Sequence, residues 1–233
     1  MLVTKIRNIA FAASFLLALL PVRSLWAADD LQKVLAKLDA SSKNFHSASA
    51  DFEFDTITTE PIYEKDVQTG SVYYDRSTSN FQMAAHIRDE NSKPVPKTVV
   101  YKGGKMQLYE KLTDHVTTLS KLSQYGDFFR LGFGASGQEL AARWDITYAG
   151  DEKIDGVNTA KLDMVPKDPT VRKNLPKVTL WMDTDRAVSL KQHFDQGQGQ
   201  SRDSIYTNIK LNQRLPSDAF TFSTDKQTQF TNQ

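Results

Sequence analysis

Apolar and polar residues alternate with a period of two along most of the chain. Apolar residues stand at positions 48, 50, 52 and 54, and serine, aspartate or glutamate stands between and after them. This is the pattern of a strand with one buried and one solvated face. It predicts a first strand over residues 48–55. The stretch VQTGSVYYDRSTSNFQMAAHI, residues 67–87, predicts two further strands joined by a polar turn, with Arg76 at the exit of the first.

The same alternation continues nearly to the C-terminus. Further strands are predicted near residues 66–75, 80–88, 97–102, 105–110, 115–119, 144–150, 158–165, 178–183, 187–195, 204–211 and 219–223. Tight turns are predicted at 102–105, 183–186 and 197–199. About a dozen antiparallel strands would make a sheet so wide that strand twist curls it. Helices or a ligand could then fill the concave side.

Helical spacing interrupts this pattern in three places. Leu31, Val34, Leu35 and Leu38 form one apolar stripe, which predicts a helix over 30–43 with an acidic N-cap at residues 29 and 30. Large apolar residues crowd among glycines over 122–134, which indicates a short helix flanked by flexible glycines. Residues 136–144 predict another short helix.

The N-terminus has the layout of a secretory signal peptide. Lys5 and Arg7 precede an apolar run over 9–20, and Pro21 and small residues follow. The run is shorter than the ~20 residues that a membrane-spanning helix needs. We expect cleavage after Ala27, with an uncleaved anchor as the alternative. Residues 28–233 are then expected to form a single exported domain, in the periplasm if the source is bacterial.

Composition narrows the possible functions. The chain has no cysteine, so it forms no disulfide or thiolate metal site, and it cannot be lipidated on an N-terminal cysteine. Its formal net charge is +1, with basic and acidic residues intermixed. This balance gives nucleic acid no electrostatic reason to bind. No linker, repeat or low-complexity tract divides the exported part.

The sequence shows no recognisable catalytic or metal-binding pattern. His46, His86, His115 and His193 lie on different predicted strands, and none has a second ligand at metal-binding spacing. Asp183 and Asp185 lie in a predicted turn, where aspartate is typical. No phosphate loop, nucleophile elbow or dinucleotide fingerprint is present. The sequence therefore predicts a protein without enzymatic activity, metal or cofactor.

Large apolar side chains are abundant on the predicted sheet faces. Those that could line a ligand cavity are Phe52, Phe54, Phe81, Met83, Ile87, Met106, Leu108, Leu162, Met164, Leu180 and Met182. A plain core would show the same stripe. The methionines favour a surface that accepts variable apolar partners, because a thioether side chain is flexible.

Several segments together resemble the outer-membrane lipoprotein carrier proteins of the LolA type. They are NFHSA and DFEF at 44–54, GSVYYDR at 70–76 with Phe81, VYKGGKMQLY at 100–109, VTLWMD at 178–183, and YTNIKLN through AFTF at 206–222. The shared order and spacing carry the resemblance, which spans nearly all of residues 28–233.

The resemblance implies a mainly β fold with some helix: an incomplete, half-open antiparallel β-barrel of about 11 strands, with short helices as a lid or plug on the concave side. It implies a monomeric carrier that shelters the acyl chains of lipoproteins. Its expected partners are an inner-membrane lipoprotein-releasing transporter complex and an outer-membrane lipoprotein receptor. A related glycolipid carrier or lipoprotein sensor remains the alternative.

The resemblance also implies individual roles. Arg76 matches the arginine that hydrogen-bonds carbonyls of the lid and holds the cavity shut, and Phe81 matches the aromatic that favours onward transfer. A solvated charge at a strand end would equally explain Arg76. The family commonly has proline where this chain has Ser77, and residues 91–96 are expected to form an extra-long loop.

The lid is assigned to Phe128, Phe129, Leu131 and Phe133, with Gly126, Gly132 and Gly134 as hinges. Burial of the same aromatic and aliphatic residues in a fixed core is the alternative.

Overall fold

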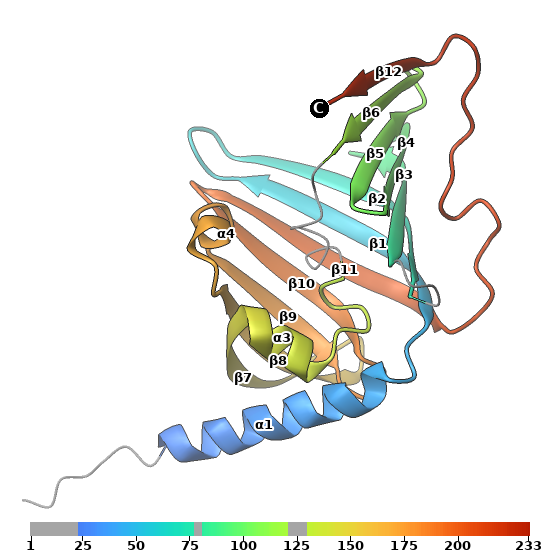
Figure 1. Cartoon of the computed structure of the whole chain (residues 1–233). Helices are drawn as coiled ribbons and strands as arrows, with labels where there is room; N and C mark the ends of the chain where they lie inside the picture. The colour runs from blue at the N-terminus through green and yellow to red at the C-terminus, as the bar shows by residue number, and fades with distance from the viewer. Residues whose placement is uncertain (1–22, 77–80, 121–129) are drawn as a thin grey trace, which may run out of the picture.

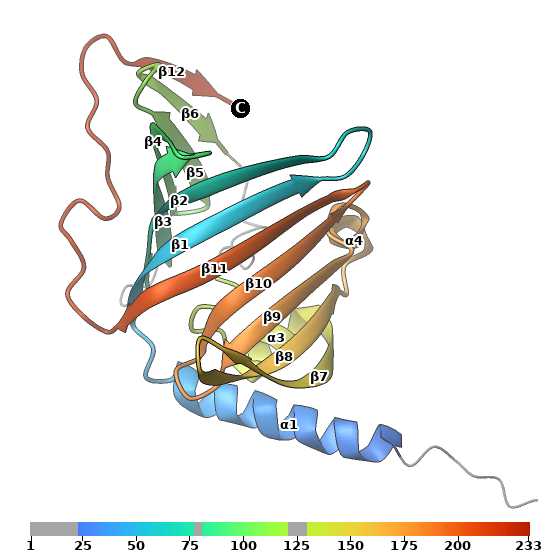
Figure 2. The same cartoon turned by 180° about the vertical axis from the view of Figure 1, so that it is seen from behind.

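The protein is a strongly curved, open β-sheet with helices on its concave side and across one end (Figures 1 and 2). The computed structural model describes residues 23–76, 81–120 and 130–233. Within those ranges, twelve strands form one sheet in the order β12-β6-β5-β4-β3-β2-β1-β11-β10-β9-β8-β7. The sheet does not close on itself. The predicted half-open β-barrel with short helices is therefore confirmed.

Most strands are longer than the sequence pattern predicted. The strands are β1 (Ser47–Thr58), β2 (Glu64–Asp75), β3 (Gln82–Glu90), β4 (Lys93–Lys102), β5 (Lys105–Glu110), β6 (His115–Leu119), β7 (Trp144–Ile154), β8 (Val157–Pro166), β9 (Lys177–Asp183), β10 (Val188–Gly197), β11 (Gln200–Leu211) and β12 (Gln229–Asn232). The helices are α1 (Arg23–Ser42), α3 (Gly137–Arg143) and α4 (Pro169–Asn174). None of these helices is long and apolar enough to span a bilayer.

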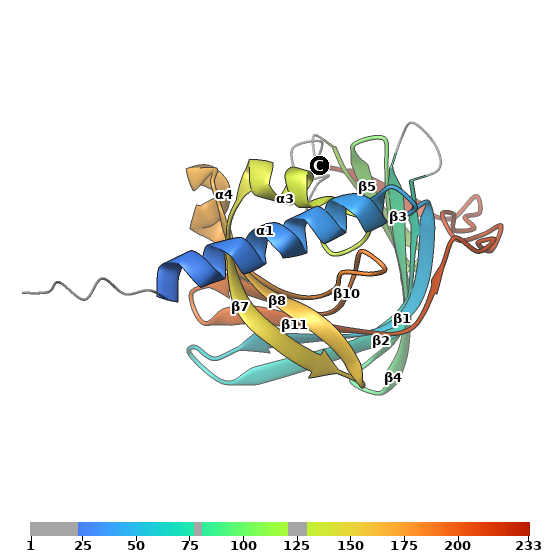
Figure 3. The ribbon, with the colours of Figure 1, turned by 90° about the horizontal axis from the view of Figure 1, so that it is seen from below.

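Helix α1 runs across one end of the sheet, while α3 and α4 lie on the concave side (Figure 3). Leu35 and Leu38 of the predicted stripe are buried. Leu38 belongs to an apolar cluster against which Leu31 and Val34 also pack. The predicted acidic N-cap is wrong, because α1 begins at Arg23 and passes through residues 29 and 30. The expected cleavage position at Ala27 therefore lies inside α1.

Two apolar clusters fill the inner side of the curve. One lies between α1, α3 and strands β7–β10, and it includes Leu38, Leu140, Trp144 and Phe194. The other gathers around Phe133 on strands β1–β3, β10 and β11. The strands supply these clusters because alternate residues share one face of a sheet.

Two predicted local features are wrong. Residues 91–96 do not form a long loop: Asn91 and Ser92 make a two-residue turn with φ of 51° and 63°, and β4 begins at Lys93. Such a turn needs two residues in the left-handed region, which asparagine tolerates. The short helix predicted within 122–134 lies mostly outside the described residues; residues 130–132 form a turn, and Phe133 forms an isolated bridge. Helix α4 was not predicted.

The second wrong feature is the predicted strand at 219–223. These residues belong to an arm that crosses the outer face of the sheet: the ring Nε2 of His86 lies 2.8 Å from the carbonyl oxygen of Ala219, and Phe222 stacks on Tyr109 with ring centroids 5.1 Å apart. The apolar alternation of the arm reflects this packing. The chain then ends in β12, which pairs with β6, the single parallel pair in the described sheet.

Candidate functional site

The concave face carries a segment, residues 130–136, that crosses it between the sheet and α3. Backbone hydrogen bonds hold it to the start of β10: Ser189 N–H donates to the carbonyl of Gly132 at 2.7 Å, and Gly134 N–H donates to that of Ala187 at 2.8 Å. Phe133 forms an isolated bridge with Val188. We call residues 130–136 the crossing segment. It contains Leu131 and Phe133 of the predicted lid, whereas Phe128 and Phe129 lie outside the described residues.

Both described lid side chains are buried. Leu131 belongs to the helix-covered cluster, and Phe133 is the centre of the other. The ring of Phe133 packs edge-on against Tyr206, with centroids 4.9 Å apart. Gln192 on β10 donates from Nε2 to the carbonyl of Leu131 at 3.0 Å. The crossing segment is thus fixed to the sheet by both backbone and side chains.

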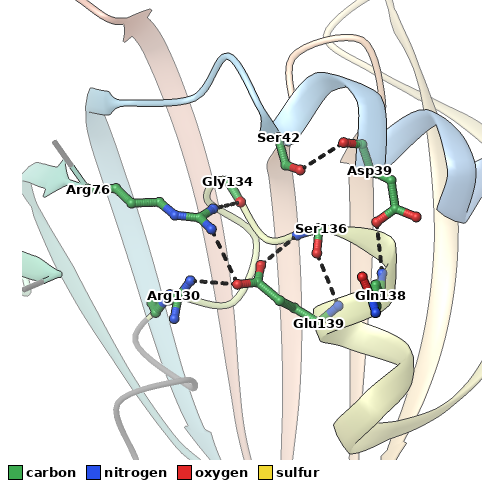
Figure 4. Close-up of polar contacts among 8 residues, drawn as sticks. All are labelled: Asp39, Ser42, Arg76, Arg130, Gly134, Ser136, Gln138 and Glu139. Atoms are coloured by element: carbon green, nitrogen blue, oxygen red, sulfur yellow. Dashed lines mark hydrogen bonds and ion pairs between the residues drawn. The ribbon is translucent and has the colours of Figure 1, made fainter. Parts of the chain in front are cut away.

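Arg76 also holds the crossing segment. Its backbone N–H donates to the carbonyl of His46 at 2.7 Å, which places the residue at the end of β2. Its guanidinium donates to the carbonyl oxygen of Gly134 at 2.5 Å and to Glu139 Oε1 at 3.3 Å (Figure 4). One third of the side chain is exposed. The arginine therefore connects a central strand to the segment that covers the concave face.

Glu139 on α3 accepts hydrogen bonds from several groups around the crossing segment, including Arg76. Its Oε1 also accepts from Arg130 at 3.0 Å, and its Oε2 accepts the backbone N–H of Ser136 at 2.9 Å (Figure 4). Ser136 Oγ accepts from the N–H of Glu139 in return, which completes a capping box. Burial raises the pKa of Glu139, but the Ser136 hydrogen bonds and the charges of Arg76 and Arg130 outweigh it, so the pKa is lowered.

Close backbone packing lets this arrangement form. Gly134 has φ +72°, and a Cβ atom there would lie 2.2 Å from a ring carbon of Phe45. Any other residue would push the carbonyl of Gly134 away from Arg76. Helix α1 reaches the same place, because Asp39 Oδ1 accepts the backbone N–H of Gln138 at 2.9 Å, and Ser42 donates to the carbonyl of Asp39 (Figure 4).

The predicted cavity residues fall into two groups. Under α1 and α3 lie four side chains with no exposed surface, and in this conformation they are core: Leu162, Met164, Leu180 and Met182. The others lie on the part of the face formed by β1–β5. Of these, Phe52 and Ile87 are buried, and the rest are half-buried: Phe54, Phe81, Met83, Met106 and Leu108.

A cavity of about 280 Å³ adjoins the Arg130–Glu139 pair, and Leu131, Leu140 and Trp144 line its apolar side. It is slightly smaller than typical ligand pockets of about 300–1,000 Å³. Within the described ranges, no three histidine, aspartate or glutamate side chains form a group that could hold a metal ion.

Several residues of the site were missed by the sequence analysis. Ser136 and Glu139 form an S-x-x-E pattern, which is a recognised signature of a helix N-terminus. Tyr74 and Tyr206 could also have been found, since each occupies an inward position of a predicted strand. Nothing in the sequence pattern points to Gln192 or to the partner of Arg76, because both contacts join segments about 60 residues apart.

Comparison with solved structures supports the fold. The chain is similar to an uncharacterised conserved protein from Thermus thermophilus, with a TM-score of 0.54 and 12% identity over 88% of this chain and 99% of that one. It is also similar to MucB, with a TM-score of 0.51 and 17% identity over 84% of this chain and 63% of that one. The LolA superfamily protein NE2245 from Nitrosomonas europaea matches more loosely, with a TM-score of 0.41 and 17% identity over 82% and 97%.

No family model matches the sequence, and no curated protein matches it. At 12–17% identity, the structural matches bear on the fold alone. The curved open sheet with helices on its concave side agrees with the half-open β-barrel with short helices that the sequence resemblance implied.

Proposed function

We propose that this protein is an exported, non-enzymatic carrier that binds the acyl chains of lipoproteins on the concave face of its sheet and moves them from the inner to the outer membrane. Export would follow from the signal peptide at residues 1–27. Cargo would come from an inner-membrane transporter complex and pass to an outer-membrane receptor. The carrier would act as a monomer.

One observation carries the proposal: the apolar side chains on the two halves of the concave face are buried to different degrees. The half beneath α1 and α3 is packed with fully buried side chains. On β1–β5, by contrast, five large apolar side chains remain half-buried: Phe54, Phe81, Met83, Met106 and Leu108. An apolar surface of this kind, next to a segment held by a few polar contacts, is suited to an apolar ligand.

Acyl chains have a strong reason to use such a surface. Each methylene group moved from water to an apolar site gains about 0.8 kcal/mol, so a lipid anchor does not cross an aqueous compartment unescorted. A carrier must also release its cargo. Contacts that favour the closed state lower the net affinity, since ligand binding has to offset the free energy of opening.

Arg76 supplies such a contact in this proposal. Its bonds to Gly134 and Glu139 favour the closed position of the crossing segment. Displacement of that segment would withdraw Phe133 and uncover Tyr74 and Tyr206, and with them the centre of the second apolar cluster. Arg76 would thus set the balance between uptake and release, and Phe81, whose ring stacks on Tyr74, would favour onward transfer.

The test is mass spectrometry of the protein purified from its native compartment. The expected result is co-purifying acylated peptide. Transfer from inner-membrane vesicles to receptor should then require the purified carrier, and Arg76→Leu should fold normally but impair transfer. Unchanged transfer by Arg76→Leu would reject the gating role. A preparation that contains free lipid and no acylated peptide would reject lipoprotein as the cargo.

The second candidate is a glycolipid carrier or lipoprotein sensor built on the same face. The shared fold with MucB favours it, since MucB has been solved in complex with MucA. Co-purified glycolipid, or a stable protein complex that forms only when lipid is bound, would support this candidate over a shuttle.

A further inference from the structure

Arg202 lies on β11 with its side chain on the concave face. Its cross-strand partners are Thr56 on β1 and Phe194 on β10. The guanidinium carbon is 5.4 Å from the ring centroid of Phe54 and 5.0 Å from that of Phe194. Phe194 belongs to the helix-covered cluster, whereas Phe54 packs against the other. A cation therefore sits between the two apolar clusters.

This arginine has no polar partner among the residues that the structure describes. Its Nε is buried and makes no hydrogen bond, and none of its nitrogens pairs with a carboxylate. By contrast, Arg76 and Arg130 of the crossing region share Glu139. A partly buried guanidinium normally pairs with carboxylates or carbonyls, because an unpaired donor keeps its desolvation cost.

A second unpaired group lies beside it. Ser204 is two residues further along β11, on the same face and opposite Phe54 and Gln192. It has no exposed surface, and its Oγ makes no hydrogen bond of normal geometry, although it is close enough to the Tyr206 hydroxyl to lower the pKa of that group. A hydroxyl can also donate to an anion, although it carries one donor and no charge, whereas a guanidinium carries five donors and a positive charge. Arg202 and Ser204 thus place two hydrogen-bond donors two residues apart on the concave face of β11.

The neighbouring carboxylates are engaged elsewhere. Asp203 Oδ1 lies 2.7 Å from His193 Nδ1 on the outer face, and Asp195 Oδ1 accepts the N–H of Gly197. Asp66 shares the row of Arg202, but it is two strands away, about 10 Å, and accepts from Asn91.

The positive potential of Arg202 reaches the tyrosines of the second cluster. Burial raises the pKa of Tyr206 and of Tyr74, and the charge of Arg202 opposes that rise at both hydroxyls. The guanidinium therefore acts across the same surface that the proposed function assigns to acyl chains.

We propose that Arg202 and Ser204 bind the anionic group of an acidic amphiphile, a carboxylate or a phosphate, whose acyl chain lies along the adjoining apolar face. The inference rests on the proposed function only in taking that face as an acyl-chain site. It adds a ligand class, because an uncharged diacylglyceryl group offers only neutral ester carbonyls, which bind a guanidinium more weakly than an anion does. Phe54 and Phe194 hold the guanidinium by cation–π contact while it remains available.

The test compares ligands that differ only in charge. Binding of a fluorescent fatty acid, its methyl ester and a lysophosphatidic acid of the same chain length is measured at about pH 8, where the carboxyl group is ionised. The wild-type protein should bind at least one acid about tenfold more tightly than the ester, a difference typical of one charged hydrogen bond. Comparison of the two acids separates a carboxylate from a phosphate ligand.

The variants locate that preference. Arg202→Met should remove it and leave ester affinity unchanged, and Ser204→Ala should reduce it. Arg88→Met is the matched control, since Arg88 is an exposed arginine on β3, and it should retain the preference. If Arg202→Met does not fold, Arg202→Lys serves instead, with a smaller preference expected because lysine lacks the planar fork.

The outcomes separate this inference from the proposed function. Equal affinity of the wild-type protein for acid and ester overturns the anion site and leaves the acyl site standing. A preference that survives in Arg202→Met also overturns it. Failure of all three ligands to bind refutes the acyl site itself.

Discussion

The ring of Phe133 lies face to face on the ring of Tyr74, with centroids 4.0 Å apart and planes inclined by 10°. Phe133 is on the crossing segment and Tyr74 is on β2, so this stack joins the cover of the concave face to its floor. Tyr206 packs edge-on against the same ring. The centre of the face is therefore filled by the protein's own side chain, which an acyl ligand would have to displace.

Replacement of Phe133 by alanine should lower stability and raise ligand affinity together. Loss of a buried phenylalanine costs about 3–5 kcal/mol, and the same change removes the side chain that competes with the ligand. We expect a lower melting temperature but tighter binding of a fluorescent acyl ester. Leu140→Ala is the control, since Leu140 is on α3 and is buried in the helix-covered cluster, away from Tyr74 and Tyr206. It should lower stability without tightening binding, and equal effects of both variants on affinity would contradict the model.

Glu139 should make closure sensitive to acid. Its pKa is lowered in the folded protein, so its contribution to stability is full above the ordinary value of 4.5 and is lost as the pH falls through the lowered pKa. Glu139→Gln removes that contribution. The melting temperature of the wild-type protein should exceed that of Glu139→Gln at about pH 7, and the difference should shrink as the pH falls below the ordinary carboxyl pKa of 4.5 and through the lowered pKa.

A control separates this effect from general charge removal. Glu53 lies exposed on β1, away from the crossing segment. Glu53→Gln should leave the melting temperature at about pH 7 nearly unchanged, as expected for an exposed surface position. A constant difference between wild type and Glu139→Gln across the whole range would show that the carboxylate charge is not what holds Arg76 and Arg130.

Gly137 should be intolerant of even one methyl group. A Cβ atom there would lie 2.3 Å from the carbonyl oxygen of Leu35, which is backbone of α1 and cannot move alone. Alanine favours a helix by about 1 kcal/mol over glycine, but overpacking costs about 1–3 kcal/mol. We therefore expect Gly137→Ala to be destabilised, by about 2–4 °C in melting temperature per kcal/mol.

The adjacent exposed position provides the comparison. Gln138→Ala keeps the backbone N–H that donates to Asp39 and adds no contact with α1. It should be neutral or slightly stabilising, as its helix propensity suggests. If Gly137→Ala is also stabilising, the close approach of α1 and α3 is not a constraint on the fold.

Much of the sheet could be predicted because the alternation that marks a strand is visible within that strand's own residues. Phe52 and Phe54 alternate with charged residues, and that period places them on one face without any knowledge of their neighbours. The sequence could not show which part of that face stays open. Leu180 and Met106 follow the same alternation, yet Leu180 lies under α1 and α3, and Met106 is half-buried on β5.

The features that were predicted wrongly or not at all depend on packing between residues far apart in the sequence. Ala219 and Phe222 have the spacing of a strand, but their contacts are with His86 and Tyr109 on the outer face of the sheet. Arg202 was not singled out, because a lone arginine on a strand gives no local sign of an unpaired, partly buried position. Arg76 was singled out through the family resemblance, and its acceptors Gly134 and Glu139 became known only from the structure.

The strand β12 should protect the sheet edge rather than stabilise the fold. Its four residues are exposed, including Phe230 with 62% of its surface accessible, and it pairs only with β6. Deletion of residues 229–233 removes little buried surface, so we expect a small change in melting temperature. It also uncovers the backbone donors and acceptors of β6, and an open edge promotes pairing between molecules. Light scattering over a concentration series should therefore show self-association of the truncated protein. Phe230→Ser, which keeps the backbone pairing, should remain monomeric; a truncated protein that stays monomeric at every concentration would show that the β6 edge needs no cover.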